Sequence, residues 1–401
     1  MKPSIFLLLL TYAAFVSLGL PDGAFGVAWP SMRADLGEPL EALGIVTSLW
    51  TTCSALSSFV SARVLSRFGT LNVVLYSGLT TGLCLLGFAW ASSFALVVAL
   101  ALPFGFGAGS VDAGMNHHAA AHYKSRHMNW LHAAWGVGAT LGPLTITAAV
   151  SSGRGWRSGF VLIAAAQLAL VVLLFVSRSA WQKAPTREGA EAAAEAGAEA
   201  AAEQGALISV TPRRAKSALW LAPATYALYA GAEGGIGLWA ASVLREGRGF
   251  DAALAGTIAS SYFAAITVGR VIAGVVADSV GNRRMVHAGI SLAGVGVILF
   301  AAPLGAWGAI SGVSLIGLGF APIYPCLMHE TPRRFDSGTA AKVIGRQVAF
   351  AYLGGMVLPP LIGLAAGRIG LFVVAPAVGA LLVLLAVSVV LLDTRTPPLP
   401  S

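Results

Sequence analysis

The chain has 401 residues, of which 57% are hydrophobic and only 10% are charged, and its mean hydropathy is +0.78. Soluble domains carry about 25% charged residues, so this composition excludes an ordinary soluble protein and predicts an integral membrane protein. The net charge of +8 does not indicate nucleic-acid binding, because the basic residues lie in short loops between apolar segments.

Twelve apolar segments are long enough to cross a bilayer, which takes about 20 residues in a helix. Hydrocarbon offers no water to the backbone, so each segment is predicted to be helical. The first segment follows Lys2, as in a signal peptide, but it runs beyond the roughly 7–15 residues of a signal core and is expected to be a membrane span. The predicted spans are 5–30, 41–65, 72–91, 94–118, 128–150, 157–178, 217–243, 252–277, 285–303, 307–329, 339–366 and 369–392.

An Ala/Glu-rich segment separates the sixth and seventh spans. Its glutamates at 191, 195, 199 and 203 are four residues apart, which places them on one face of any helix that forms. We interpret residues 181–215 as a cytoplasmic linker, helical or disordered. It would join an N-terminal six-helix bundle at 1–180 to a C-terminal six-helix bundle at 216–401.

The Lys and Arg residues indicate the orientation of the chain. If the N-terminus is cytoplasmic, eighteen of them fall on the inner side and six on the outer side. Cytoplasmic loops are enriched in these residues, so both termini are predicted to be cytoplasmic and the protein to lie in the inner (cytoplasmic) membrane.

The two halves of the chain echo each other. Gly69 and Gly281 are 212 residues apart, in the segments "SRFGTLN" and "DSVGNRR" that end the second and eighth spans. The acidic residues Asp22 and Glu233, in the first and seventh spans, are 211 apart, and each precedes a Trp. This pattern predicts a duplicated six-helix unit, an arrangement in which transporters bind substrate between the halves.

The stretch "GVVADSVGNRRMV" after the eighth span resembles the cytoplasmic loop signature of the major facilitator superfamily. The first-half copy, "ARVLSRFGTLNVV", keeps Arg67 and Gly69 but has Ser66 where that family carries Asp. The resemblance implies a transporter with the major facilitator fold, an all-α membrane protein of twelve helices in two pseudo-symmetric bundles. The residues that match the gating-loop motif are Gly274, Asp278, Gly281, Arg283 and Arg284.

A narrower resemblance concerns the segments "VDAGMNHH", "MNWLHAAWGVGATLGPL", "YALYAGAEGGIGLWAASVL", "GFAPIYPCLMHETPRRF" and "GRQVAFAYLGGMVLPPLIG". They are similar to the fucose–proton symporter branch and to sodium-dependent glucose-transporter-like proteins. This resemblance implies a small sugar-like polar solute that is coupled to H⁺, or alternatively to Na⁺.

Three carboxylic acids lie inside predicted spans: Asp22, Asp112 and Glu233. A carboxylate at the centre of a membrane helix costs about 2.5–3.5 kcal/mol. A single substitution would remove that cost, so we interpret the three acids as ion-coupling groups facing an interior cavity. The alternative is a carboxylate that only fixes helix packing, and for Asp22 "PDG" could also mark a helix break near the outer surface.

Polar and aromatic side chains near these acids are candidates for substrate binding. Asn116 lies one turn after Asp112 on the same face, and Tyr226 and Tyr229 share a face with Glu233. His132 is expected to hydrogen-bond Asp112 or Asn116 across the helix pair. The substrate-binding candidates are Asn116, His132, Tyr226, Tyr229, Trp239 and Gln347.

Several residues allow a plainer interpretation. Trp239 could anchor its helix at the outer interface, and Arg270 in the eighth span is expected to snorkel to the inner surface. His118 and His122 share a helix face, as metal ligands would, but histidines near a cytoplasmic helix end are common. The three cysteines, Cys53, Cys84 and Cys326, lie in apolar spans without ligand spacing, so no metal or cofactor is expected.

The sequence contains no G-x-S-x-G, H-E-x-x-H or P-loop motif, so it predicts a transporter and not an enzyme. The expected partners are a small-molecule substrate, H⁺ or Na⁺ and the lipid bilayer, with the protein a monomer. One alternative stays open: "GVGATLGP", with Gly138, Gly142 and Pro143, resembles the fifth-helix signature of proton antiporters and would fit efflux of amphipathic compounds.

Overall fold

The structure is a computed structural model that describes residues 5–122, 125–182 and 212–396. Every regular element in these ranges is a helix, which confirms the predicted all-α membrane fold class. The Ala/Glu-rich segment from 183 to 211 lies outside the described residues, so the predicted linker stays a prediction.

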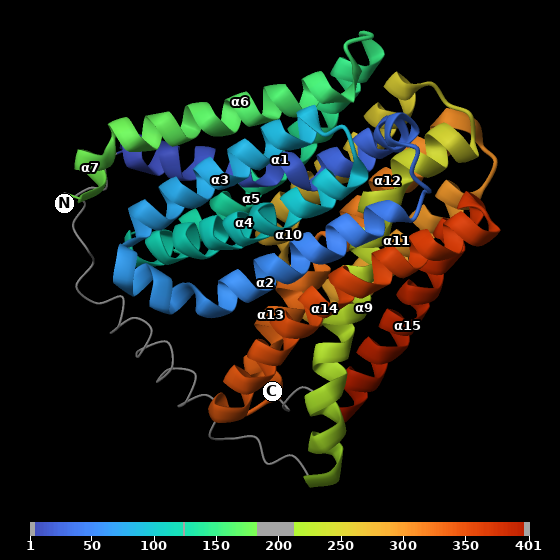
Figure 1. Cartoon of the computed structure of the whole chain (residues 1–401). Helices are drawn as coiled ribbons and strands as arrows, with labels where there is room; N and C mark the ends of the chain where they lie inside the picture. Colours follow the sequence, from blue (N-terminus) through green and yellow to red (C-terminus); the bar gives the residue numbers. More distant parts are fainter. Residues whose placement is uncertain (1–4, 123–124, 183–211, 397–401) are drawn as a thin grey trace. The chain divides into compact units, whose positions relative to one another are not determined.

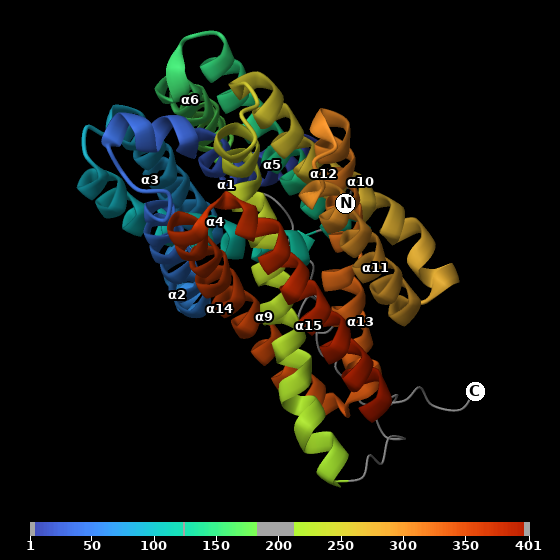
Figure 2. The same cartoon turned by 90° about the vertical axis from the view of Figure 1, so that its right-hand side faces the viewer.

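Six long helices and one short helix form the first part of the chain, coloured blue to green in Figure 1. Helix α1 packs against α5, and α4 packs against both α2 and α3. Figure 2 shows the same helices from the side. Their bounds are α1 Ile5–Leu36, α2 Ala42–Phe68, α3 Thr70–Trp90, α4 Phe94–His122, α5 Ser125–Ser151, α6 Gly155–Val176 and α7 Arg178–Gln182.

The second part of the chain also consists of long helices, one of which is interrupted. The predicted span 307–329 is two helices, α12 and α13, which are separated at Ala321 and Pro322. The bounds are α9 Pro212–Ser242, the π-helix η1 Val243–Gly247, α10 Ala252–Val280, α11 Asn282–Ala301, α12 Gly305–Phe320, α13 Ile323–Arg334, α14 Ser337–Ile369, the 3₁₀-helix η2 Leu371–Val373 and α15 Val374–Arg395.

Within the described residues, eleven helical stretches are long and apolar enough to cross a membrane. Helix α9 is not among them, because it is rich in Gly, Tyr and Trp and carries Glu233. Large apolar side chains such as Phe59, Val275 and Trp307 are exposed, with 75%, 78% and 84% of their surface accessible. Surfaces of this kind are typical of helices that face lipid rather than water.

The described helices form two compact units. One contains Met1–Arg187 with Gly237–Thr267 and Pro360–Val374, and the other contains Glu188–Ile236, Val268–Pro359 and Ala375–Ser401. The boundaries between the two units fall inside α9, α10 and α14, because each unit groups residues that pack together and not whole helices. The boundary that the sequence places between residues 180 and 216 stays a prediction.

Helices α1 and α5 approach each other closely because small residues line their contact. A side chain added at Gly138 would collide with the carbonyl oxygen of Val16, and one added at Gly142 would collide with that of Leu20. Glycines at such contacts let two membrane helices pack backbone to backbone. The glycines of "GVGATLGP" therefore have a packing role in this structure.

The loops at Gly69 and Gly281 have the same backbone conformation. Gly69 joins α2 to α3 with φ 78° and ψ 147°, and Gly281 joins α10 to α11 with φ 89° and ψ 140°. Residues with a side chain rarely adopt a positive φ of this kind, so both positions need glycine. The match supports the internal repeat inferred from the spacing of these residues.

Candidate substrate and ion site

Asp22 lies in the middle of α1 and is bound by a side chain from α5. The indole Nε1 of Trp135 donates a hydrogen bond to Asp22 Oδ2 over 2.8 Å. An indole N–H inside the membrane needs an acceptor, and a carboxyl group in the membrane needs a donor, so each group satisfies the other. The carboxyl group of Asp22 therefore has a neutral partner.

Asp112 and Asn116 lie one turn apart on α4, as their spacing predicts. Asn116 Nδ2 donates to Asp112 Oδ1 over 2.9 Å and to the Asp112 carbonyl oxygen over 3.0 Å. Asp22 and Asp112 both belong to the first unit. Their partners, an indole and an amide, carry no charge.

Sequence reasoning chose His132 on α5 and missed Trp135, which lies one turn further along the same helix. The His132 ring packs edge-on against Phe15 with centroids 5.9 Å apart. The expected contact of His132 with Asp112 or Asn116 stays a prediction. The signal for Trp135 was its indole N–H in an apolar span, which requires an acceptor nearby.

Glu233 on α9 has a charged partner, unlike Asp22 and Asp112. Tyr229 Oη donates to Glu233 Oε1 over 2.9 Å, and Arg270 Nη2 on α10 lies 3.5 Å from the same oxygen. About a quarter of each charged side chain is accessible, 26% for Glu233 and 24% for Arg270. Arg270 was expected to snorkel, and its pairing with Glu233 is a correction to that interpretation.

The broken tenth span lies beside this ion pair. The ring of Tyr229 packs against Phe320, the last residue of α12, and against Tyr324 at the start of α13, with centroids 5.7 and 6.0 Å apart. A side chain at Gly269, next to Arg270, would collide with Ala321 in the break. Ala321 and Pro322 keep right-handed helical dihedral angles, so α12 and α13 follow one another across a short interruption within one apolar stretch.

The other predicted binding residues are buried in this conformation. Tyr226 Oη donates to the Tyr324 carbonyl oxygen over 3.1 Å, and Gln347 Nε2 donates to Thr331 Oγ1 over 2.9 Å. The Trp239 indole is fully buried against Gly363. A substrate contact at any of the three stays a prediction and would require these helices to move.

The gating-loop motif is joined to a network of ions in the second unit. Arg283 Nε pairs with Glu330 over 2.9 Å, and Arg283 also lies 3.7 Å from Asp393. Asp393 in turn accepts from Arg334 over 2.6 Å and lies 2.9 Å from His287 Nε2. The positions of Glu330, Arg334 and Asp393 in this network were not predicted, because they come from α13 and α15, far away in the sequence.

The remaining motif residues have simpler surroundings. Gly274 and Arg284 are exposed, and Gly281 forms the turn into α11. The side chain of Asp278 lies outside the part of the chain that the structure describes. Its predicted role in gating stays a prediction.

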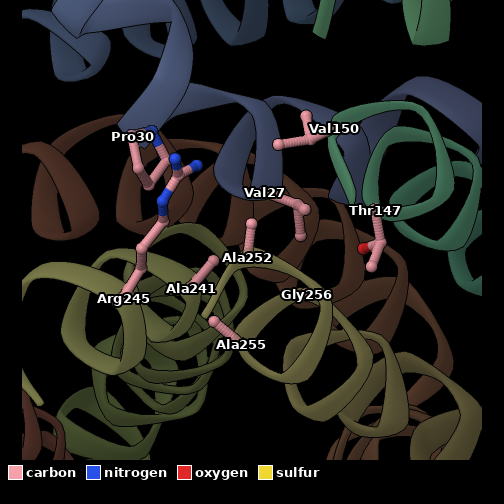
Figure 3. A pocket seen from close by; sticks show the side chains of 9 residues that line it. All are labelled: Val27, Pro30, Thr147, Val150, Ala241, Arg245, Ala252, Ala255 and Gly256. Atoms are coloured by element: carbon pink, nitrogen blue, oxygen red, sulfur yellow. The ribbon is translucent and has the colours of Figure 1, made fainter. Parts of the chain in front are cut away.

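A small cavity in the first unit is lined by none of the three acids. Arg245 of η1 reaches into it toward Pro30 (Figure 3), and its Nη1 lies 2.5 Å from Ser31 Oγ. The neighbouring Glu246 pairs with Arg33 over 2.5 Å. The residues that line this cavity are Val27, Pro30, Thr147, Val150, Ala241, Arg245, Ala252, Ala255 and Gly256.

Metal binding has no support in the described residues, which contain no cluster of three or more His, Cys, Asp or Glu side chains. The buried ring of His118 stacks on Trp181 with centroids 4.3 Å apart. The side chain of His122 lies outside the described part of the chain.

Comparison with known proteins agrees with this architecture. The sequence pattern of the Major Facilitator Superfamily matches residues 11–328 and 224–401. The chain belongs to the Major Facilitator Superfamily. It is therefore a multi-pass membrane transporter and not an enzyme, as the sequence predicted.

Two curated relatives are similar to this chain. It is 23% identical to the probable sulfoacetate transporter SauU of Cupriavidus necator over 358 residues, which are 86% of this chain and 83% of the relative. It is 28% identical to the probable anion transporter 3, chloroplastic, of Oryza sativa subsp. japonica over 152 residues, which are 37% of this chain and 29% of the relative.

Two solved structures have the same fold. The crystal structure of a D-xylose-proton symporter matches with a TM-score of 0.75 at 13% identity, covering 99% of both chains. A bacterial homologue of the human lysosomal transporter Spinster, in an inward-facing and occupied conformation, matches with a TM-score of 0.74 at 15% identity, covering 99% of this chain and 98% of the other. At these identities the likeness shows the fold alone.

Proposed function

We propose that this transporter moves a small polar solute across the cytoplasmic membrane by alternating access, together with a proton. The two six-helix halves would rock around a central site, with both termini in the cytoplasm. Na⁺ is the alternative coupling ion. The observation that carries the proposal is the presence of three acids well inside long helices, each with a defined partner.

The partners are compatible with gain and loss of a proton. Asp22 accepts from Trp135, and Asp112 accepts from Asn116, so each acid keeps a hydrogen bond whether it is neutral or charged. Acids in the membrane interior typically mark ion pathways and proton relays. Asp112 and Glu233 are the principal coupling candidates, and Asp22 is the third.

The solute class follows from the same neighbourhood and from the relatives. The amide of Asn116 beside Asp112, and the phenol of Tyr229 beside Glu233, would bind hydroxyl groups of a sugar-like solute. The names of the relatives mention sulfoacetate and anions, which are also small and polar. Sugar-like solutes and such anions are both polar solutes, so the proposal names a polar solute.

Proton-driven efflux of an amphipathic compound is the second candidate. It rests on Gly138, Gly142 and Pro143, which resemble the antiporter signature. The packing of α1 on α5 accounts for two of these residues without any reference to efflux. Symport and antiport differ in the direction of the proton, so one experiment separates them.

The test uses the full chain in proteoliposomes, with a pH gradient imposed across the membrane and labelled polar solutes outside. We expect accumulation when the outside is acidic, and loss of accumulation in Asp112→Asn while solute exchange persists. Asp251→Asn, which removes an exposed acid just outside the α10 span, is the matched control and should accumulate normally. Accumulation that is equal in Asp112→Asn and wild type would refute the coupling assignment. A gradient that expels solute would favour efflux.

A further inference from the structure

We infer that Arg346 on α14 and Trp220 on α9 form a binding site for the headgroup of an anionic phospholipid. The site uses none of the residues assigned above to the solute or the coupling ion. It therefore adds a lipid partner to the transporter, and it can be tested without knowledge of the solute.

Arg346 and Trp220 join two neighbouring helices. The guanidinium carbon of Arg346 lies 4.8 Å from the centroid of the Trp220 ring, and the ring of Phe350 packs on the same indole with centroids 6.2 Å apart. Helices α9 and α14 run side by side in Figure 2, because Gly354 leaves room for the backbone of Ala227. The aromatic ring attracts the cation and holds it at one place on the surface.

The N–H donors of this pair are available to a ligand. In the part of the chain that the structure describes, neither the guanidinium of Arg346 nor the indole N–H of Trp220 has a hydrogen-bond acceptor or a carboxylate partner. Trp220 is 57% exposed, and Arg346 is half-buried. A guanidinium carries five N–H donors and an indole carries one, so the pair can bind a group rich in oxygen.

A second Arg–Trp pair in the chain shows which group such donors bind. The guanidinium carbon of Arg157 lies 4.4 Å from the ring of Trp156. Asp35 Oδ2 accepts from Trp156 Nε1 over 2.8 Å and from Arg157 Nη1 over 2.6 Å, so one anionic oxygen satisfies both donors. At Arg346 and Trp220 the described chain supplies no such oxygen. The matching ligand is an anion that brings its own, as a phosphate does.

The charges around the pair also favour an anion. Lys342 is exposed one turn before Arg346, and α14 contains no acidic residue. Asp336 lies just before α14, roughly 15 Å from Arg346 along the helix, and accepts from the Thr339 N–H. The sequence just before Trp220 is basic, with Arg213, Arg214 and Lys216.

The place of the pair on the helices identifies a lipid as the source of the anion. Helix α14 has 33 residues and is therefore roughly 50 Å long, more than the hydrocarbon thickness of about 30 Å, so its first turns can reach the headgroups. Tryptophan is enriched at that level, and basic pockets between membrane helices bind anionic headgroups. Further along the face of Arg346, Leu353 and Val357 are 46% and 37% exposed and offer an apolar track to an acyl chain.

The test is native mass spectrometry of the delipidated full chain in detergent. The two lipid probes are dioleoylphosphatidylglycerol and dioleoylphosphatidylcholine, which share their acyl chains and a phosphate, but the choline cation cancels the charge of the second. We expect phosphatidylglycerol to bind at least about fivefold more tightly, as expected for one basic residue at an anionic surface. Inorganic phosphate at the same concentration should not displace it, because phosphate has no acyl chain.

Variants assign the binding to this pair. Arg346→Gln should lower the affinity for phosphatidylglycerol about fivefold to tenfold, and Trp220→Phe, which keeps a ring but removes the N–H, about threefold. Arg346→Lys keeps the charge without the planar fork and should fall between wild type and Arg346→Gln, so it tests the site even if Arg346→Gln is unstable. Arg178→Gln is the matched control and should bind like wild type, because it removes an exposed arginine that lies 4.5 Å over the ring of Phe175.

Each result has a defined meaning. Affinity for phosphatidylglycerol that is unchanged in Arg346→Gln and Arg346→Lys overturns the inference. An equal loss in Arg178→Gln also overturns it, because the lipid would then respond to the total charge and not to this pair. Equal binding of phosphatidylcholine, or displacement by inorganic phosphate, rejects an anionic lipid as the ligand. None of these outcomes changes the solute accumulation that tests the proposed function.

Discussion

The two halves of the chain hold their membrane acids in different ways. In the first half, Asp22 and Asp112 accept hydrogen bonds from Trp135 and Asn116, which carry no charge. In the second half, Glu233 lies beside the guanidinium of Arg270. A neutral N–H donor can form a hydrogen bond to an acid in either protonation state, whereas the charge of a guanidinium favours the ionised acid. The first long helix of each half therefore carries an acid, but the charges around the two acids differ.

The same contrast recurs at the loops that follow α2 and α10. Gly69 and Gly281 share one backbone conformation. Beside Gly69, Arg67 lies over the ring of its neighbour Phe68, with 5.6 Å between the guanidinium carbon and the ring centroid. Beside Gly281, Arg283 joins the ion network with Glu330 and Asp393. The two loops share one backbone conformation, while the ion pairs lie beside the second loop.

The largest predicted effect is at Arg270. Arg270→Gln removes the positive charge beside Glu233 and should destabilise the protein by up to about 3–5 kcal/mol, because it leaves a partly buried carboxylate without that charge. Adding Glu233→Gln should restore most of the loss. The measurement is the melting temperature in detergent at pH 7.5. A double variant as unstable as the single one would show that the pair is not the source of the effect.

A smaller effect is expected where the acid has a neutral donor. Trp135→Phe removes the hydrogen bond to Asp22 and should cost about 1–3 kcal/mol, the penalty of an unsatisfied buried polar group. Trp90→Phe, at a side chain that is 71% exposed, is the matched control and should change little. Thermal melts of the two variants give the comparison. An equal loss of stability in both variants would show that the hydrogen bond to Asp22 is not the cause.

The two loop glycines should respond alike, despite their different surroundings. Gly69→Ala and Gly281→Ala each place a side chain at a positive φ and should cost about 1–2 kcal/mol. Gly294→Ala, inside α11 where an added methyl group meets nothing within 4 Å, should instead be neutral or slightly stabilising. The check is a melt of each purified variant. A loss at Gly281 alone would indicate that the ion network, and not the backbone, sets its sensitivity.

The smallest effect concerns an acid outside the spans. Asp336 precedes α14, and its Oδ1 accepts from the Thr339 N–H over 3.0 Å, which lowers the pKa of Asp336 below 3.8. A lowered pKa stabilises the fold above the unfolded pKa, and this contribution is lost as pH falls through the folded pKa. Asp336→Ala should cost about 0.5–1 kcal/mol at pH 7.

The control for this prediction is the pH itself. The difference in melting temperature between Asp336→Ala and wild type should shrink as pH falls below 3.8, the ordinary pKa of an Asp. A difference that does not change between pH 7 and acidic buffer would show that the charge of this cap does not contribute.

The sequence predicted the helices well because membrane spans are selected for length and apolarity, which are local properties. It also placed Asp112 and Asn116 on one helix face, where residues four apart are neighbours. It did not find Trp135 as the partner of Asp22 or Arg270 as the partner of Glu233. Both contacts join different helices, and their register depends on how closely those helices pack.

The break in the tenth span was also missed. Ala321 and Pro322 lie in an apolar stretch of suitable length, so hydropathy treats it as one helix. Helix α9 shows the opposite case: its glycines, tyrosines and Glu233 lower its apolarity, although its position in the repeat predicts a span. In both places, the hydropathy of the segment does not match the helices of the structure.

Simultaneous recording of proton and solute movement tests the central claim most directly. Proteoliposomes carrying the full chain and an internal pH dye would receive solute from outside with no gradient imposed. The account predicts that the lumen acidifies as solute enters, and that Asp112→Asn and Glu233→Gln admit solute without acidification. Solute entry in wild type with no change of internal pH would contradict it.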